Sequence, residues 1–355
     1  MVIELRGCFH GGIYSVDPSL VKIDFSSNVN PLGVSKIVLS SIQKDLRSLS
    51  SSYPDPECRD LKKSLSDYLK IHCECINVGN GATEIIHNFA RMFAREKVII
   101  PSPSFCEYEL ASRRMGASFI LVPLKNFNLD ADLIIEKAKG SDAIFLCNPN
   151  NPTGLLYRKS LKTIIERLDS STKILVDECF IELVNGSNRH TMIRNIDEFD
   201  NLIILRSLTK SFGLAGLRLG YSVSNPRLAK KLASGQISWN VNGIAQRAGI
   251  VALRDSQHLT RARAIVKKER DFMYSNIRKK TQCFSPFKSD ANYFLIRLTN
   301  HNSSTEVRDS LLAQSGVLVR DCSTFSGMGS KYIRVAIKNH GENLILLNAL
   351  ESIES

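Results

Sequence analysis

The sequence predicts an α/β protein with a mainly parallel sheet in a large domain and a smaller α/β domain at the C-terminus. Short apolar strand patterns alternate with helical patterns along the chain, which is the order expected of βαβ units. The length of 355 residues exceeds that of a typical single domain. Polar motifs follow several predicted strands, where open α/β sheets bind ligands. Together these observations favour two domains and a ligand site at one sheet edge.

The predicted elements of the large domain follow one another in a regular order. The apolar strand candidates are residues 98–100, 118–122, 143–147, 174–176 and 202–205. Helices are expected before and between these strands, at residues 85–94, 106–115 and 160–168. This alternation predicts a mainly parallel sheet.

The rest of the chain predicts a bridge and a second unit. Residues 245–280 are expected to form one long helix that leads into the C-terminal domain. That domain is expected to contain strands at 293–298, 317–320 and 332–337 and helices at 305–315 and 342–353. We therefore divide the chain into an N-terminal segment at 1–30 that joins the small domain and the site, a large domain at 31–255 and a small domain at 256–355.

Lys210 directly follows a predicted strand, in the run Arg206-Ser207-Leu208-Thr209-Lys210. An amine at a strand end can form a Schiff base with a carbonyl, and burial would lower its pKa enough to make it nucleophilic. The hydroxyls of Ser207 and Thr209, with Arg218, can hold a phosphate. One segment thus supplies the two groups that pyridoxal phosphate requires. The alternative, which describes most lysines, is a surface residue.

Three further motifs accompany Lys210. Asp177 follows the predicted strand that ends at residue 176, and its carboxylate can pair with a pyridinium nitrogen, although an N-cap aspartate is the simpler alternative. The loop at 148–154 presents asparagine amides at a strand tip, because its prolines fix φ and Gly154 permits a turn. A glycine-rich turn at 79–84 enters a helix whose N-terminus is open to a phosphate.

In this order, the motifs resemble those of the fold-type I pyridoxal-phosphate enzymes, in the aminotransferase group, over nearly the whole chain. The resemblance implies that Lys210 binds the cofactor covalently, that Asp177 pairs with its ring nitrogen and that Asn151 binds its phenolic oxygen. The residues that it implies for the cofactor phosphate are Ala82, Thr83, Ser207, Thr209 and Arg218. It also implies that Phe105 stacks on the ring and that Tyr53 reaches the neighbouring subunit's cofactor in a homodimer with shared active sites.

Finer matches resemble the threonine-phosphate decarboxylase branch of cobalamin biosynthesis. They lie at residues 10–12, 24–33, 206–210, 216–221, 239–242, 319–322 and 332–337. Phe180 stands where many histidinol-phosphate aminotransferases carry a tyrosine. The branch implies decarboxylation of L-threonine O-3-phosphate to (R)-1-amino-2-propanol O-2-phosphate. Arg334 would position the substrate carboxylate, and the candidates for the phosphate side are His10, Asn30 and Arg320, with Asn151 also at the substrate.

Two alternatives remain open. Histidinol-phosphate aminotransferase, in histidine biosynthesis, would use the same residues with Lys210 as general base. A retired binding or regulatory protein on this scaffold would not need intact Lys210, Asp177 and Asn151, so these residues argue against it.

Composition excludes other classes of function. The net charge of +12 does not predict nucleic-acid binding, because the basic residues are scattered among acids. No apolar stretch approaches ~18 residues, which argues against a membrane protein, and there is no secretory start. The nine cysteines show no zinc spacing, so we expect no metal and a reduced, cytoplasmic protein.

Overall fold

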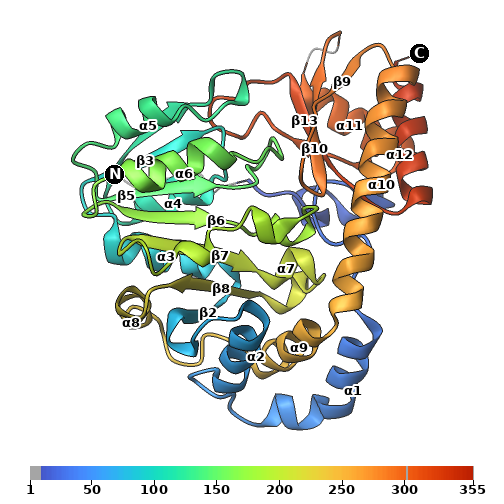
Figure 1. Ribbon diagram of the computed structural model, residues 1–355. Coiled ribbons are helices and arrows are strands. Elements are labelled where there is room, and N and C mark those ends of the chain that lie inside the picture. The colour runs from blue at the N-terminus through green and yellow to red at the C-terminus, as the bar shows by residue number, and fades with distance from the viewer. Residues whose placement is uncertain (1–8, 301–302, 355) are drawn as a thin grey trace, which may run out of the picture.

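The computed structural model describes residues 9–300 and 303–354, and its main feature is a sheet of seven strands in the order β2-β8-β7-β6-β5-β3-β4 (Figure 1). The five strands from β7 to β4 are mutually parallel, whereas β8 runs antiparallel to both β7 and β2. The strands are β2 Ile76–Asn80, β3 Lys97–Ser102, β4 Ser118–Pro123, β5 Ala143–Cys147, β6 Lys173–Asp177, β7 Leu202–Ser207 and β8 Leu219–Ser224. The prediction of an α/β fold with a large, mainly parallel sheet is confirmed.

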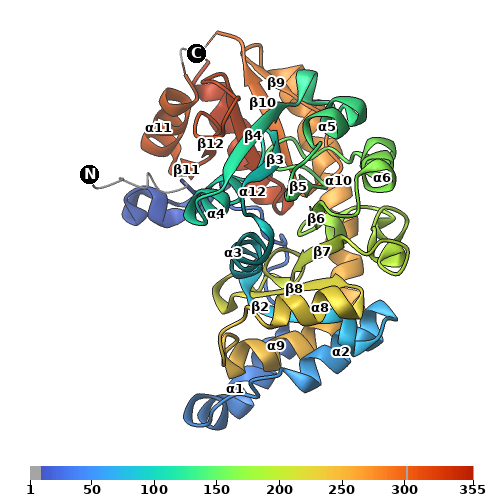
Figure 2. The same ribbon diagram turned by 90° about the vertical axis from the view of Figure 1, so that its left-hand side faces the viewer.

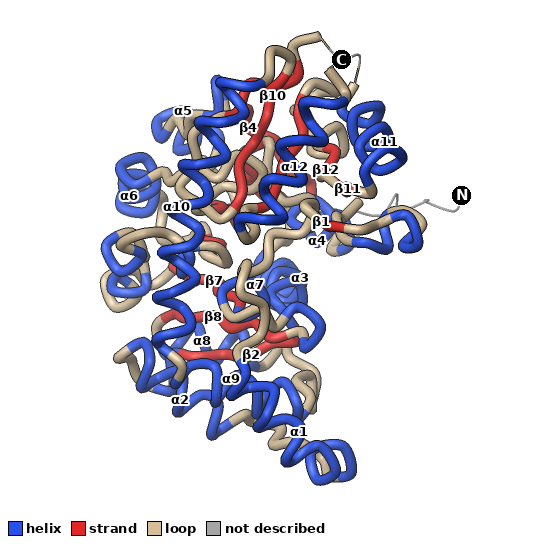
Figure 3. Tube along the Cα trace, turned by 90° about the vertical axis from the view of Figure 1, so that its right-hand side faces the viewer, coloured by secondary structure: helices blue, strands red, loops and turns tan. Residues whose placement is uncertain are grey.

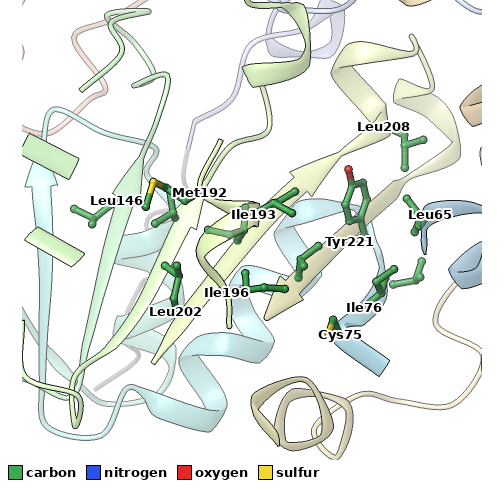
Figure 4. Close-up of a cluster of buried hydrophobic side chains, with 14 of the residues drawn as sticks. Leu65, Cys75, Ile76, Leu146, Met192, Ile193, Ile196, Leu202, Leu208 and Tyr221 are labelled. Atoms are coloured by element: carbon green, nitrogen blue, oxygen red, sulfur yellow. The ribbon is translucent and has the colours of Figure 1, made fainter. Parts of the chain in front are cut away.

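Alternate residues of each central strand enter different hydrophobic cores, because successive side chains of a strand point to opposite faces. Ile144 and Ile174 belong to one core, and their neighbours Phe145 and Leu175 belong to the other. Figure 4 shows part of the first core, where Leu146 lies beside Met192 and Leu202 lies near Ile196. A sheet that is buried on both faces must carry helices on both.

The helices of the large part of the chain supply these two layers. Their bounds are α1 Lys36–Ser51, α2 Arg59–Leu69, α3 Gly81–Phe93, α4 Glu107–Arg114, α5 Ala131–Lys137, α6 Arg158–Arg167, α7 Leu208–Ser211, α8 Pro226–Ala233 and α9 Gly243–Arg254. Helices α3, α4 and α8 contribute to one core, and α2, α5, α6 and α9 contribute to the other. Helices α1 and α9 pack together at the edge of the molecule near β2 (Figure 2).

The C-terminal part forms a smaller α/β unit. Its antiparallel sheet has the order β12-β13-β10-β9, and helices α11 and α12 pack beside it. The bounds are α10 Ser256–Lys280, β9 Phe284–Pro286, β10 Tyr293–Leu298, α11 Ser304–Ser315, β11 Val317–Leu318, β12 Arg320–Asp321, β13 Tyr332–Ala336 and α12 His340–Ser352. The N-terminal strand β1 Ile23–Asp24 pairs in parallel with β11, so the beginning of the chain lies against its C-terminal part (Figure 3).

Two predicted elements are divided in the structure. The prediction of one long helix at 245–280 is wrong at Asp255, where the backbone leaves the helical conformation. The side chain of Asp255 is the N-cap of α10 and accepts a hydrogen bond from the backbone N–H of His258. The strand expected at 317–320 is two short strands, because β11 pairs with β1 whereas β12 pairs with β13. The domain boundaries at residues 30 and 255 remain predictions.

Several expected absences concern only the described residues. Among them no helix is long and apolar enough to span a membrane, and no group of three or more acidic, histidine or cysteine side chains suits a metal ion. Seven of the cysteines that the structure describes are free thiols. Cys106 is disulfide-bonded, so the expectation of a reduced chain is wrong at that residue.

Candidate active site

A cavity of about 520 Å³ lies where β5, β6 and β7 end, between the large sheet and the C-terminal unit. It is lined by residues from widely separated regions of the sequence, including the N-terminal segment and the start of α3. Nearly all residues predicted for the site meet there: His10, Ala82, Thr83, Phe105, Asn151, Asp177, Ser207, Thr209, Lys210, Arg218, Arg320 and Arg334. Tyr53 and Asn30 do not line it.

Lys210 lies in the short helix α7, directly after β7, and its half-buried side chain lines the cavity. The side chain of Ser207 caps this helix by accepting a hydrogen bond from the backbone N–H of Thr209 at 3.2 Å. Burial, reinforced by the positive charge of the nearby Arg334 guanidinium, lowers the pKa of Lys210 to about 8. The neutral, nucleophilic amine is therefore far more populated near neutral pH than in an exposed lysine.

Asp177 ends β6, and its two carboxylate oxygens have separate donors. The hydroxyl of Tyr108 donates to Oδ2 at 2.6 Å, and the backbone N–H of Cys179 donates to Oδ1 at 2.9 Å. Tyr108 is fully buried on α4 and stacks on Phe145 with ring centroids 4.9 Å apart. The sequence did not identify Tyr108, because its partner is 69 residues away. These two bonds hold the carboxylate in one orientation at the end of its strand.

The first turn of α3 and the side chain of Arg218 form an anion cradle. Gly81 has a φ of +78°, and a Cβ there would lie 2.6 Å from Nη2 of Arg218. A Cβ on Gly220 would lie 2.6 Å from the backbone nitrogen of Ala82. Both glycines therefore allow contacts that a side chain would block. The hydroxyl of Thr209 is buried and has no hydrogen-bond partner within the described residues, which fits a phosphate oxygen as its missing partner.

Arg334, on β13, is buried and meets only neutral oxygens within the described residues. It donates to the side-chain oxygen of Asn151 and, at 2.6 Å, to the carbonyl of Ser26. The amide oxygen of Asn28 lies 3.3 Å away once its side chain is oriented to accept. Burial lowers the pKa of Arg334, as expected for a cation without a carboxylate partner.

Arg320, on β12, is in a similar position. It donates to the carbonyl of Phe9 at 2.5 Å and to the hydroxyl of Thr324 at 2.7 Å, and its guanidinium lies over the ring of Phe325. Burial and the charge of Arg334 lower the pKa of Arg320 to about 10. Two buried guanidinium groups, neither of which has a counter-ion among residues 9–300 and 303–354, thus face one cavity.

The loop that carries Asn151 depends on Gly154. This glycine has a φ of +75°, and a Cβ there would lie 2.1 Å from the hydroxyl oxygen of Ser289. Tyr293 donates its hydroxyl to the carbonyl of Asn150 at 2.9 Å. The loop is therefore fixed against the start of β10, with Asn151 directed at Arg334.

Two predicted residues lie elsewhere. Tyr53 is 86% exposed, its ring lies 5.4 Å from that of Trp239, and it does not line the cavity of this subunit. Asn30 is buried and uses its amide internally, donating to the carbonyl of Ser211 at 2.7 Å and accepting from Leu32 at 2.9 Å. Its backbone N–H also donates to the carbonyl of Lys210. Both site assignments remain predictions.

A buried ion pair stabilises the strand ends from the opposite side of the sheet. Glu178 follows Asp177, and Arg206 precedes Ser207, so both side chains point away from the cavity. Their charged groups are 2.9 Å apart and both are at least 95% buried. Thr191 donates to the same carboxylate at 2.8 Å. We call Glu178, Arg206 and Thr191 the rear network.

These groups fit pyridoxal phosphate. The cradle and Thr209 suit its phosphate, Lys210 suits its aldehyde carbon, and Asp177 suits its ring nitrogen. Phe105 lies at the cavity wall with its ring 5.7 Å from that of His10, where an aromatic side chain can cover a bound ring.

Comparisons with known proteins agree with this geometry. The family model for aminotransferase class I and II matches residues 21–350. A candidate threonine-phosphate decarboxylase of Caldanaerobacter subterraneus subsp. tengcongensis is 35% identical over 97% of this chain and 93% of its own. The solved histidinol-phosphate aminotransferase of Clostridium acetobutylicum is 34% identical, with a TM-score of 0.87 over 94% of this chain and 99% of its own. The L-threonine-O-3-phosphate decarboxylase of Porphyromonas gingivalis is 25% identical, with a TM-score of 0.82 over the same shares.

Proposed function

The chain belongs to the aminotransferase class I and II family, and from this premise we propose that it is a pyridoxal-phosphate enzyme that decarboxylates L-threonine O-3-phosphate. The product would be (R)-1-amino-2-propanol O-2-phosphate, for cobalamin biosynthesis in the cytoplasm. The cofactor, when bound, supplies an electron sink for the carbanion that loss of carbon dioxide leaves. Lys210 would hold it covalently, and Asp177 would keep its ring nitrogen protonated.

The observation that carries this proposal is the pair of buried arginines, Arg334 and Arg320, which have no counter-ion in the part of the chain that the structure describes. A buried guanidinium is costly unless an anion pairs with it, so a cavity with two of them favours a ligand with two anionic groups. Threonine phosphate carries a carboxylate and a phosphate in one small molecule. Arg334 can bind the carboxylate through its planar fork, and Arg320 can bind the phosphate.

The remaining steps use side chains of this chain. The lowered pKa of Lys210 allows its amine to release and accept a proton near neutral pH, as returning a proton to the substrate requires. The rear network fixes the ends of β6 and β7, so Asp177 and Ser207 keep their separation while the substrate enters. Phe180, whose ring lies 6.0 Å from the amine of Lys210, keeps water from this part of the cavity.

Histidinol-phosphate aminotransferase is the second candidate, and the favouring observation is the solved relative at 34% identity. The same lysine and aspartate serve both reactions, which differ in the bond broken at the substrate's Cα. Histidinol phosphate has no α-carboxylate, so Arg334 would act only on the second substrate, glutamate or 2-oxoglutarate.

We also propose a homodimer with shared active sites. Apolar side chains are exposed on α1, at Ile37, Leu39 and Leu46, and at Tyr53, whose ring lies 5.4 Å from that of the exposed Trp239. Apolar groups of this kind favour burial against a partner. A second subunit on this face would remove Tyr53 from water and bring it toward the neighbouring cofactor phosphate.

The experiment that tests the activity supplies the purified protein with pyridoxal phosphate and offers two substrates separately. We expect carbon dioxide from threonine phosphate and no glutamate from histidinol phosphate with 2-oxoglutarate. The Lys210→Ala variant, prepared in parallel, controls for contaminating activity. Glutamate formation without carbon dioxide would replace the decarboxylase with the aminotransferase.

A further inference from the structure

Glu107 lies in the cavity wall between two histidines, an arrangement that the proposed mechanism does not use. It begins α4, and its side chain is only 7% exposed. Its Oε1 lies 2.8 Å from Nε2 of His10, and its Oε2 lies 2.8 Å from Nε2 of His87. His10 comes from the N-terminal segment, whereas His87 lies on α3. One carboxylate therefore joins three parts of the chain.

The protonation of Glu107 fixes the direction of both hydrogen bonds. Burial alone would raise the pKa of this carboxyl group, but the two imidazole hydrogen bonds outweigh it and lower the pKa to about 2. An ionised carboxylate accepts hydrogen bonds and donates none, so each Nε2 must carry a hydrogen. Both rings are thus held in one tautomer and one orientation.

The neighbours of His10 are also fixed. We call residues 9–12 the N-terminal strap. The carbonyl of Phe9 accepts from Arg320, and the backbone N–H of Gly12 donates to the hydroxyl of Ser26 at 2.7 Å. A Cβ on Gly11 would lie 2.7 Å from the carbonyl oxygen of Ser26, so only glycine permits this approach. The strap is therefore bound to the C-terminal unit through Arg320 and to the large sheet's helices through Glu107.

A negatively charged Glu107 is unexpected in the wall of this cavity. A carboxylate in the wall of a cavity that receives anions would repel them, because the low dielectric strengthens the interaction. Here both carboxylate oxygens are covered by imidazole N–H groups. The site therefore retains the carboxylate as an attachment point whose two oxygens are each occupied by an imidazole.

We propose that Glu107 is a positioning residue that holds the N-terminal strap over the substrate cavity through His10, with His87 completing its hydrogen bonds. Phe9 occupies Arg320 with a neutral carbonyl that an anionic group of the substrate can displace. The bond between His10 and Glu107 keeps the strap in place during this exchange. The substrate's identity rests on the proposed function, whereas the attachment of the strap does not.

The test compares Glu107→Gln with two other variants in the cofactor-loaded protein. A glutamine offers one oxygen and one N–H₂, so it cannot accept from both imidazoles. Glu166→Gln is the matched control, because Glu166 lies on α6 in an exposed pair with Lys162. His87→Asn removes the second imidazole partner of Glu107, and it replaces Glu107→Gln in the test if that variant does not fold.

The first measurement is amide hydrogen exchange of residues 9–26 without substrate, and the second is KM and kcat with threonine phosphate. The loss of a hydrogen bond to a charged group changes an equilibrium constant by about tenfold to hundredfold. We expect exchange to quicken about tenfold in Glu107→Gln, with KM raised about tenfold, kcat changed less than about twofold, and no change in Glu166→Gln. His87→Asn should move both quantities in the same direction.

Unchanged exchange in Glu107→Gln and in His87→Asn would overturn the attachment. Faster exchange with an unchanged KM would overturn the positioning role. If the wild type acts on neither threonine phosphate nor histidinol phosphate, the proposed function fails by itself, and the exchange data still decide whether Glu107 holds the strap.

Discussion

Replacing Arg334 by glutamine tests the assignment of the substrate carboxylate. The guanidinium lies on β13 with neutral oxygens as its protein partners, so a carboxylate would be its first charged partner. Hydrogen bonds to charged groups contribute about 1.5–3 kcal/mol each. A bidentate pair therefore corresponds to about 3–6 kcal/mol, or roughly 10²- to 10⁴-fold in kcat/KM, by the rule of about 1.4 kcal/mol per factor of ten.

The assay is single-turnover release of carbon dioxide from threonine phosphate by the cofactor-loaded protein. The control is Arg297→Gln, because Arg297 lies on the neighbouring strand β10 and is exposed. We expect the control to match the wild type. Circular dichroism and cofactor absorbance would show that both variants fold and bind the cofactor.

The same variant separates the two candidate reactions. A decarboxylase needs Arg334 in its only substrate complex, whereas an aminotransferase would retain its half-reaction with histidinol phosphate, which has no α-carboxylate. A kcat/KM for threonine phosphate within tenfold of the wild type would refute the assignment of Arg334.

Four other perturbations have defined outcomes. The rate of covalent cofactor capture by the apoprotein should rise with pH up to about 8 and then level off, because the neutral form of Lys210 becomes the major one there; a rise that continues to pH 10 would contradict the lowered pKa. Asp177→Asn should retain the cofactor and lose most of kcat, since an amide cannot keep the ring nitrogen protonated, and near-normal turnover would exclude that role. Gly220→Ala should weaken cofactor binding in equilibrium dialysis, because its Cβ would lie 2.6 Å from the nitrogen of Ala82; unchanged affinity would show that the cradle adapts. Sedimentation should find a dimer, and Tyr53→Ala should raise the cofactor's dissociation constant; a fully active monomer would rule out the shared site.

Site residues that directly follow a strand could be predicted from the local sequence. Lys210 and Asp177 are identifiable because an apolar run precedes each of them, and the structure places both at strand ends in one cavity. The fold class follows from the same alternation of patterns. The phosphate cradle was predictable in part, because the turn at 79–84 combines glycines with a helix start.

The partners of these residues were not predictable, because each depends on a contact far along the sequence. Tyr108 reads as an ordinary helical aromatic, and only the tertiary structure brings it to Asp177, 69 residues away. Glu107 and His87 look like surface polar residues until α3 and α4 pack together. The break at Asp255 did carry a local signal, an aspartate three residues before the N–H that it caps, but the continuing helical pattern obscured it.

The rear network bears on how one scaffold can acquire different chemistries. Asp177 and Ser207 face the cavity, while the adjacent Glu178 and Arg206 form the ion pair on the opposite face of the strands. Residues on opposite faces of a strand can be exchanged almost independently, since their side chains do not share neighbours.

Natural variation can therefore alter the cavity wall, for example at Phe180 or His10, while the rear network behind Asp177 and Ser207 stays intact. A change of reaction would then require few substitutions, and the protein could remain folded after each of them. This separation of rear network and cavity wall provides a physical route by which decarboxylases and aminotransferases could diverge from one parent.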